Sequence, residues 1–200
     1  LVFSGMILLC LICLPFLRSD YKASKEELEE TLSSIISRAL RDPSYIMIFI
    51  GFFSCGFQLG FMTAHFPAFV TEICASIDAN GLLAKFGITT TAALGAVALG
   101  VIGVFNIFGT ISAGMLGNRF QKKYLLAFIY AGRTLISAWF ILVPMTPFSV
   151  LVFSVVMGSL WLATVPLTSG LVAYLFGLRY MGTMYGLVFF SHQLGSFLGV

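Results

Sequence analysis

The chain alternates between long runs of apolar residues and short polar segments. The apolar runs occupy Leu1–Leu17, Tyr45–Val70, Ala92–Leu116, Tyr124–Val143 and Phe148–Phe176, and another begins near Met181. A helix needs about 20 apolar residues to cross the hydrocarbon core of a bilayer. Because these runs are long and do not alternate apolar with polar positions, they predict membrane-spanning helices rather than the strands of a barrel.

Several residues at the edges of these runs predict where helices begin and bend. Asp42-Pro43 and Thr146-Pro147 each place a capping side chain before a proline that can take the first helical position. Pro166 falls inside the run Phe148–Phe176, where we expect it to remove a backbone hydrogen bond and bend the helix.

The longest polar segment covers residues 18–42 and carries a helical pattern. Its apolar residues recur at helical spacing, opposite acidic and basic ones, at Leu28, Leu32, Ile35, Ile36 and Leu40. This predicts a short amphipathic helix at the membrane surface. We favour a linker that joins two halves of a protein over a helix that binds a partner.

Composition supports a membrane protein and offers little for cofactor chemistry. The chain is 59% hydrophobic and 10% charged, with a mean hydropathy of +1.02, well outside the range of soluble domains. Four cysteines, which are Cys10, Cys13, Cys55 and Cys74, lie mainly in apolar runs and predict no disulfide framework. Two histidines at unrelated positions give no metal-site spacing, so we expect no metal, no cofactor and no nucleic-acid partner.

Basic residues predict the orientation of the chain. Nine of the eleven Lys and Arg residues fall in the loops around residues 18–42, 119–123 and 179, whereas the alternate loops hold only Lys85. Cytoplasmic loops of membrane proteins carry such an excess of positive charge. We therefore expect these loops to be cytoplasmic and the protein to be a multi-pass protein of the cell (inner) membrane.

Arg133 is the remaining basic residue and lies inside the run Tyr124–Val143. An arginine near the middle of a bilayer costs a few kcal/mol and needs a partner or water. No Asp or Glu lies in the apolar runs. Two interpretations stand side by side: a contact for an anionic substrate, or a structural tie between helices.

Further polar residues recur along one side of several apolar runs. They are Gln58 with His65, Asn106 with Thr110, Trp161 with Thr164 and Thr168, and Tyr185 with His192 and Ser196. Since unpaired buried polar groups are costly, these stripes predict a shared wet cavity lined by Gln58, His65, Asn106, Arg133, Trp161 and His192. Any one of them alone is better explained by a hydrogen bond to a neighbouring helix. His65 and His192 are the candidates in these runs for carrying a proton near neutral pH.

The turn after Ala92–Leu116 carries a motif. Gly114-x-Leu116-Gly117-Asn118-Arg119-x-Gln121-Lys122-Lys123 resembles the loop motif Gly-x-Leu-Ala-Asp-Arg-x-Gly-Arg-Lys of the major facilitator superfamily. The resemblance implies a gating loop on the cytoplasmic side, formed by Gly114, Asn118, Arg119, Lys122 and Lys123. Asn118 stands where the family has Asp, and Gln121 stands where the family has its second Gly.

The resemblance also implies an architecture. It predicts an all-α integral membrane protein, the C-terminal half of a 12-helix bundle. Residues 1–17 would end helix 6, residues 18–42 would form the cytoplasmic inter-half loop, and residues 43–200 would supply helices 7 to 11. The chain would then be a fragment that packs against an N-terminal half outside it.

The implied function is secondary active transport of a small molecule by alternating access. The runs that begin at Pro166 and Gly182 look similar to bacterial carriers of the monocarboxylate and oxalate/formate group. This implies a monocarboxylate-type anion, possible proton symport, and a charged pair in helix 8. Asn106 fits the first position of that pair, Thr110 stands where the family has Arg, and Arg133 is a possible substitute.

Other function classes fit less well. A carrier of a neutral solute or drug-like compound in the same superfamily is the main alternative. A channel is less favoured, and we expect no enzyme. Ser191 and His192 are adjacent, so on a helix they point about 100° apart and cannot form a nucleophile–base pair by themselves.

Overall fold

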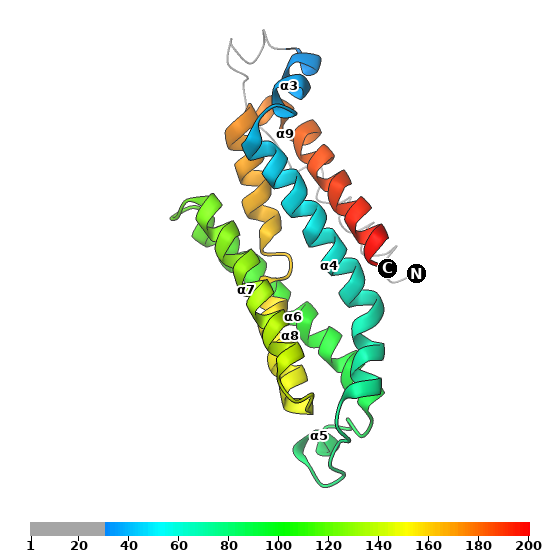
Figure 1. The fold of residues 1–200 in the computed structure, drawn as a ribbon. Helices are drawn as coiled ribbons and strands as arrows, with labels where there is room; N and C mark the ends of the chain where they lie inside the picture. The colour runs from blue at the N-terminus through cyan, green and yellow to red at the C-terminus, as the bar shows by residue number, and fades with distance from the viewer. Residues whose placement is uncertain (1–30) are drawn as a thin grey trace, which may run out of the picture. The chain divides into compact units, whose positions relative to one another are not determined.

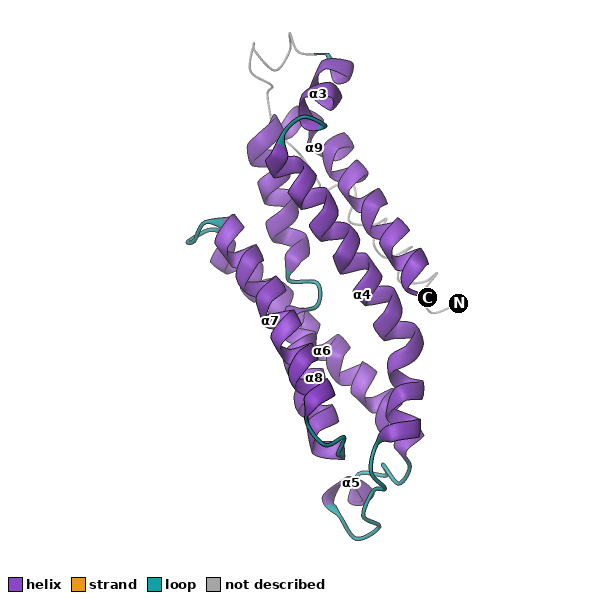
Figure 2. Cartoon of the chain, in the orientation of Figure 1, coloured by secondary structure: helices purple, strands orange, loops and turns teal. Residues whose placement is uncertain are grey.

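The computed structural model describes residues 31–200, and its regular elements are all helices (Figure 2). They are α3 (Leu32–Ala39), α4 (Pro43–Ile73), α5 (Leu82–Lys85), α6 (Thr91–Gly117), α7 (Lys122–Leu142), α8 (Pro147–Leu160) and α9 (Thr164–Gly199). This is the all-α architecture that the apolar runs predict. The run Leu1–Leu17 lies outside the described residues.

Four helical segments are long and apolar enough to cross a membrane, the last being Pro147–Gly199. That segment reverses at Gly177, whose φ of 73° is in the left-handed region that favours glycine. Figure 1 shows the second part of α9 descending beside α4 after the first part has risen. Among the described residues the chain therefore makes five passes, at the positions of the five predicted runs that fall there.

The helices begin at the predicted caps. Asp42 Oδ1 accepts a hydrogen bond from the backbone N–H of Ser44 at 2.8 Å, directly before Pro43. Thr146 Oγ1 accepts from the backbone N–H of Ser149 at 3.2 Å, and Ser149 Oγ reaches back to the N–H of Thr146 at 2.9 Å. These bonds satisfy N–H groups that have no partner within the helix.

The fourth pass is broken, but not where Pro166 predicted. The helical path is interrupted at residues 161–163, between the end of α8 and the start of α9. Pro166 is the third residue of α9, where a backbone N–H would have no partner within the helix in any case. The proline therefore follows the break and opens the new helix instead of bending a continuous one.

Helix α4 and the second part of α9 pack with their backbones almost in contact. A Cβ atom at Gly56 would clash with the carbonyl oxygen of His192, and one at Gly60 with that of Ser196. In the opposite direction, a Cβ at Gly195 or Gly199 would clash with a carbonyl oxygen of α4. Glycines spaced four apart on both helices thus make the close approach possible. We refer to these four residues as the glycine seam.

Helix α3 packs on one end of this pair. Ile35 and Ala39 are buried in a cluster with residues that include Tyr45 and Phe176. Leu32 and Leu40, which the pattern placed on the same apolar side, are exposed. The predicted amphipathic helix is present over Leu32–Ala39, with a narrower buried face than expected; Leu28 lies outside the described residues.

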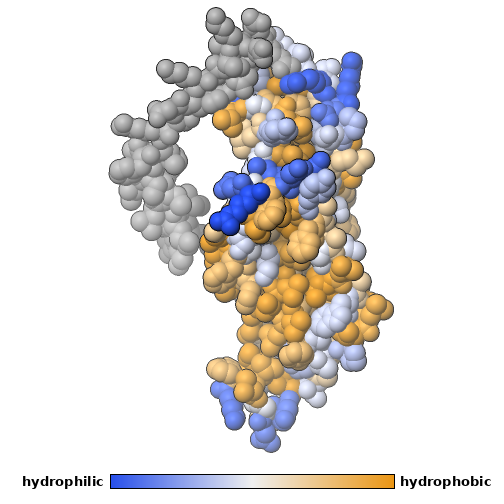
Figure 3. All heavy atoms as spheres, turned by 90° about the vertical axis from the view of Figure 1, so that its left-hand side faces the viewer, coloured by the Kyte–Doolittle hydropathy of each residue, from blue (hydrophilic) through white to orange (hydrophobic). Residues whose placement is uncertain are grey.

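The loops gather at two ends of the described part. The backbone N–H of Ala75 donates to the carbonyl of Met145 at 2.9 Å, which joins the two loops that hold few basic residues. Figure 1 shows α5 at that end and α3 at the other. Apolar side chains cover most of the face in Figure 3, with hydrophilic ones in its upper part and at its lower end, as a lipid-facing surface requires.

Candidate functional site

Arg133 lies in the middle of α7 and points into the bundle, with 2% of its surface exposed. Its Nη1 donates to Cys55 Sγ of α4 at 2.9 Å and lies 3.5 Å from the carbonyl oxygen of Trp161. Its Nε is buried and has no hydrogen-bond partner in the structure. A buried guanidinium with an unused donor is an expensive arrangement and calls for a further acceptor.

The break in the fourth pass explains part of this arrangement. Residues 161–163 leave the helix, so backbone groups there lose their usual partners. Arg133 approaches the freed carbonyl of Trp161, and Asn106 Oδ1 of α6 accepts from the backbone N–H of Leu162 at 3.0 Å. Two polar side chains from different helices thus hold the broken segment.

More polar groups surround the Cys55 thiol. Its sulfur lies 3.7 Å from Thr164 Oγ1 at the start of α9, and the ring of His192 lies beside it. His192 is 6% exposed, and its Nδ1 is buried without a partner, as is the hydroxyl of Tyr185. We call Cys55, Arg133, Thr164, Tyr185 and His192 the Arg133 cluster.

The Arg133 cluster contains no carboxylate. Among residues 31–200 the acidic side chains are Asp42, Glu72 and Asp78, which cap a helix, end a helix or lie in a loop. The positive charge of Arg133 is therefore not balanced by an acid from this part of the chain. A bound anion would balance it, and so would an ionised cysteine.

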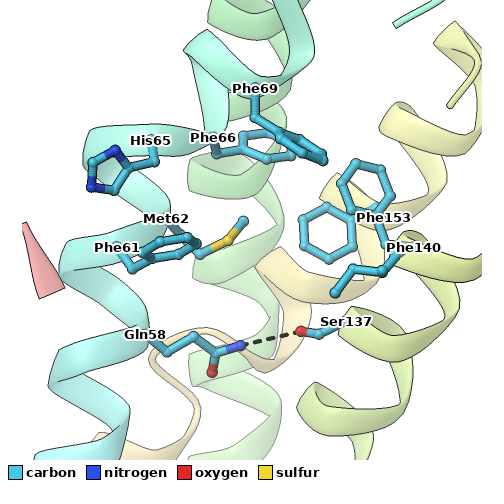
Figure 4. Close-up of a pocket in the computed structure, with 10 residues that line it drawn as sticks. Gln58, Phe61, Met62, His65, Phe66, Phe69, Ser137, Phe140 and Phe153 are labelled. Atoms are coloured by element: carbon cyan, nitrogen blue, oxygen red, sulfur yellow. Dashed lines mark hydrogen bonds between the residues drawn. The ribbon is translucent and has the colours of Figure 1, made fainter. Parts of the chain in front are cut away.

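A separate cavity of about 350 Å³ lies between α4, α7 and α8. Figure 4 shows its lining, which is mostly aromatic: Phe61, Phe66, Phe69, Phe140 and Phe153, with Met62 and Ile141. At one edge Gln58 Nε2 donates to Ser137 Oγ at 3.2 Å. We call this cavity the phenylalanine pocket. Its wall suits an apolar or aromatic group, and its polar edge offers an amide and a hydroxyl.

Comparison with known proteins decides the family. The model of the Major Facilitator Superfamily matches residues 1–200. The chain belongs to the major facilitator superfamily. The family match and the apolar helices indicate a multi-pass membrane protein of a transporter family.

The chain is also similar to an uncharacterized MFS-type transporter, YcxA, of Bacillus subtilis (strain 168). The two are 24% identical over 159 residues, which is 77% of this chain and 35% of that protein. The chain therefore spans about a third of the length of this curated relative. No solved structure matches it.

The superfamily's loop motif forms the turn between α6 and α7. Asn118 follows the last residue of α6, and Lys122 is the first residue of α7. The stem of Lys122 lies against Gly170 of α9, where a Cβ would come within 2.6 Å of Lys122 Cε. Lys123 Nζ lies 4.9 Å from the ring centre of Tyr124. Arg119 is exposed, and a Cβ at Gly114 would meet no atom within 4 Å.

The predicted cavity residues fall into two groups instead of one. One group lies around the broken fourth pass and consists of Arg133, Trp161, Asn106 and His192. His192 belongs to it because it contacts Cys55, which in turn contacts Arg133. Gln58 and His65 instead line the phenylalanine pocket, and His65 is exposed, with Nε2 3.3 Å from the carbonyl of Val200.

Two residues of these sites, Cys55 and Ser137, were not predicted from the sequence to be site residues. Cys55 and Ser137 are small, common in apolar helices and carry no spacing signal of their own. The available signal was indirect. Because Arg133 needs a polar partner and no acid lies in the runs, any polar atom at a similar depth was a candidate, and Cys55 is such an atom.

Proposed function

We propose that this chain forms part of a secondary active transporter that moves a small organic anion by alternating access, driven by the proton gradient. The observation that carries the proposal is Arg133, a buried guanidinium with an unused Nε and no acidic partner among the described residues. Arginine recognises carboxylates with two parallel N–H donors, so a monocarboxylate is the substrate class that best suits one such residue.

The broken fourth pass supports the same proposal. Interrupted helices in transporters place free backbone groups and half-helix ends beside the substrate near the middle of the membrane. Here the break at residues 161–163 lies next to Arg133, and α9 starts anew at Thr164 beside Cys55. Substrate would thus meet the guanidinium and the new helix start together.

The remaining parts of the proposal concern the whole protein. Residues 1–17 would end helix 6, residues 18–42 would link two halves on the cytoplasmic side, and residues 43–200 would supply helices 7 to 11. An N-terminal half outside this chain would pack against them in the cell membrane. Helix α3 would then lie at the cytoplasmic entrance, and the turn after Gly114 would take part in gating.

The test is uptake by proteoliposomes that contain the full-length protein. We expect saturable uptake of a radiolabelled monocarboxylate, faster with an inward proton gradient, and little uptake of the matching neutral amide. Arg133→Gln should lower anion uptake at limiting concentration by about 10- to 100-fold, because a hydrogen bond to a charged group contributes about 1.5–3 kcal/mol. Arg41→Gln, at an exposed arginine outside the cluster, should leave uptake unchanged.

A neutral or drug-like solute is the second candidate, and the phenylalanine pocket favours it. Five phenylalanines with an amide at the edge suit an aromatic compound better than a small carboxylate. Under this alternative the amide would be transported as well as the acid, and Phe140→Ala would reduce uptake more than Arg133→Gln. Two results together would reject the anion proposal: uptake that does not respond to the proton gradient, and the absence of saturable uptake for every carboxylate tested.

A further inference from the structure

Cys55 is the polar group on which the Arg133 cluster converges. It is 1% exposed and receives contacts from Arg133 of α7 and from Thr164 and His192 of α9. The distance from Arg133 Nη1 to Cys55 Sγ is 2.9 Å. This is the usual length of an N–H···O bond, although sulfur is the larger atom. Charge-assisted hydrogen bonds are the short ones, so a contact of this length favours an ionised sulfur.

Cys74 offers a comparison within the same helix. It ends α4 and is half-buried, and none of the polar or ionised side chains that surround Cys55 contacts it. Burial raises the pKa of the Cys74 thiol, which keeps its proton at neutral pH. Cys55 differs from Cys74 in its surroundings, since an arginine, a hydroxyl and an imidazole lie around its sulfur.

We propose that Cys55 is a thiolate at neutral pH, that it is the counterion of Arg133 in the empty transporter, and that it takes up the coupling proton when a substrate carboxylate replaces it on Arg133. The proposal rests on the proposed function for its substrate but not for the ion pair itself. It assigns the proton to a cysteine in a part of the chain whose described membrane helices hold no buried acid.

The charges and protons balance in each state. In the empty state the guanidinium and the thiolate sum to zero. In the loaded state one carboxylate enters with one proton, the sulfur becomes a neutral thiol, and the guanidinium pairs with the carboxylate. Neither state buries a net charge in the cluster, which low dielectric would penalise. The stoichiometry is one proton per monocarboxylate.

The groups that face Cys55 are consistent with this exchange. From α7 they are Arg133 and Tyr130, and from α9 they are Tyr185, His192 and Thr164. Arg133 is the one permanently charged member. The unpartnered Nε of Arg133, Nδ1 of His192 and hydroxyl of Tyr185 leave donors for an incoming carboxylate.

The ion pair is tested without transport. In full-length protein whose other cysteines are all replaced by serine, we expect the ultraviolet thiolate band of Cys55 at pH 7, measured as a difference from Cys55→Ser. The band should disappear in Arg133→Gln, since the counterion is then gone. A matched protein that keeps Cys74 alone should show no band. A neutral Cys55 thiol at pH 7 in the protein with Arg133 intact would overturn the inference and leave the proposed function standing.

The proton step is tested by uptake. Cys55→Ser should keep carboxylate uptake but lose its stimulation by an inward proton gradient, while Cys55→Asp, which restores an ionisable group, should regain part of it. A serine variant stimulated as strongly as the parent would overturn the coupling role. Absence of carboxylate uptake in the parent protein would reject the proposed function, and the thiolate band would still decide the ion pair.

Discussion

At the scale of single residues, polar side chains in the membrane helices form hydrogen bonds with backbone groups far away in the sequence. Arg133 and Asn106 belong to different helices, and each supplies what the break at residues 161–163 lacks. Asn106 Oδ1 also accepts from Thr110 Oγ1 at 3.4 Å, which fixes the amide orientation. The presence of a lone polar residue in an apolar run is therefore explained by a backbone group, distant in the sequence, to which it hydrogen-bonds.

Asn106 gives a prediction about this support. Asn106→Leu leaves the N–H of Leu162 without its acceptor, which should cost about 1–3 kcal/mol of stability. Asn106→Asp keeps an acceptor oxygen at the same place and should retain most of the stability. Thermal unfolding of the purified protein in detergent measures both. Equal losses for the two variants would mean that the hydrogen bond to Leu162 does not matter.

The sequence predicts those features of the site that belong to a single residue, but not the pairings that depend on the tertiary fold. The charge of Arg133 in an apolar run was visible in the sequence, as was its need for a partner. The identity of the partner was not, because Cys55 is 78 residues away in the chain and only the tertiary fold brings its sulfur within reach of the Arg133 side chain. The separation of Gln58 from the Arg133 cluster has the same origin, since Gln58 finds Ser137 one helical turn further along α7.

At the scale of helices, the apolar runs gave boundaries within a few residues, and capping residues explain why. Asp42 and Thr146 act through bonds to residues two and three positions away, so their effect is readable locally. The break in the fourth pass is held by Asn106, 56 residues from its partner, and the local sequence therefore pointed to Pro166 instead. Glycine spacing was readable too, but not which glycines are in contact.

The glycine seam gives a prediction with a control in the same helix. At Gly195 an added Cβ would meet Phe57 N at 2.9 Å, so Gly195→Ala should push α4 and α9 apart and cost about 1–3 kcal/mol. At Gly186 a Cβ would meet no atom within 4 Å, so Gly186→Ala should be neutral or stabilising, since Ala favours helix by about 1 kcal/mol over Gly. Detergent thermal-unfolding curves compare them. A reversed order would contradict the close packing of these helices.

At the scale of the whole molecule, the passes separate loops of different charge. The loops rich in Lys and Arg belong to the end with α3, and Lys85 stands at the end where Ala75 and Met145 are joined. Positive loops of membrane proteins remain in the cytoplasm. The arrangement of the helices and the distribution of charge therefore favour one orientation.

Cysteine labelling tests this orientation. In a protein without its native cysteines, Lys85→Cys should react with a membrane-impermeant maleimide added to intact cells. Arg41→Cys should react only after the membrane is opened, because it lies at the α3 end; both positions are exposed in the structure. If Arg41→Cys alone were labelled in intact cells, the orientation would be the opposite of the one proposed.

The measurement that tests the account most directly is the equilibrium binding of a monocarboxylate to the purified full-length protein. Titration calorimetry measures this binding in the parent protein and in the Arg133→Gln variant. We predict saturable binding at one site per molecule, weakened at least about tenfold by the substitution, as the loss of a charged hydrogen bond requires. Equal affinity in the two forms would show that Arg133 does not hold the substrate, and would contradict the central claim.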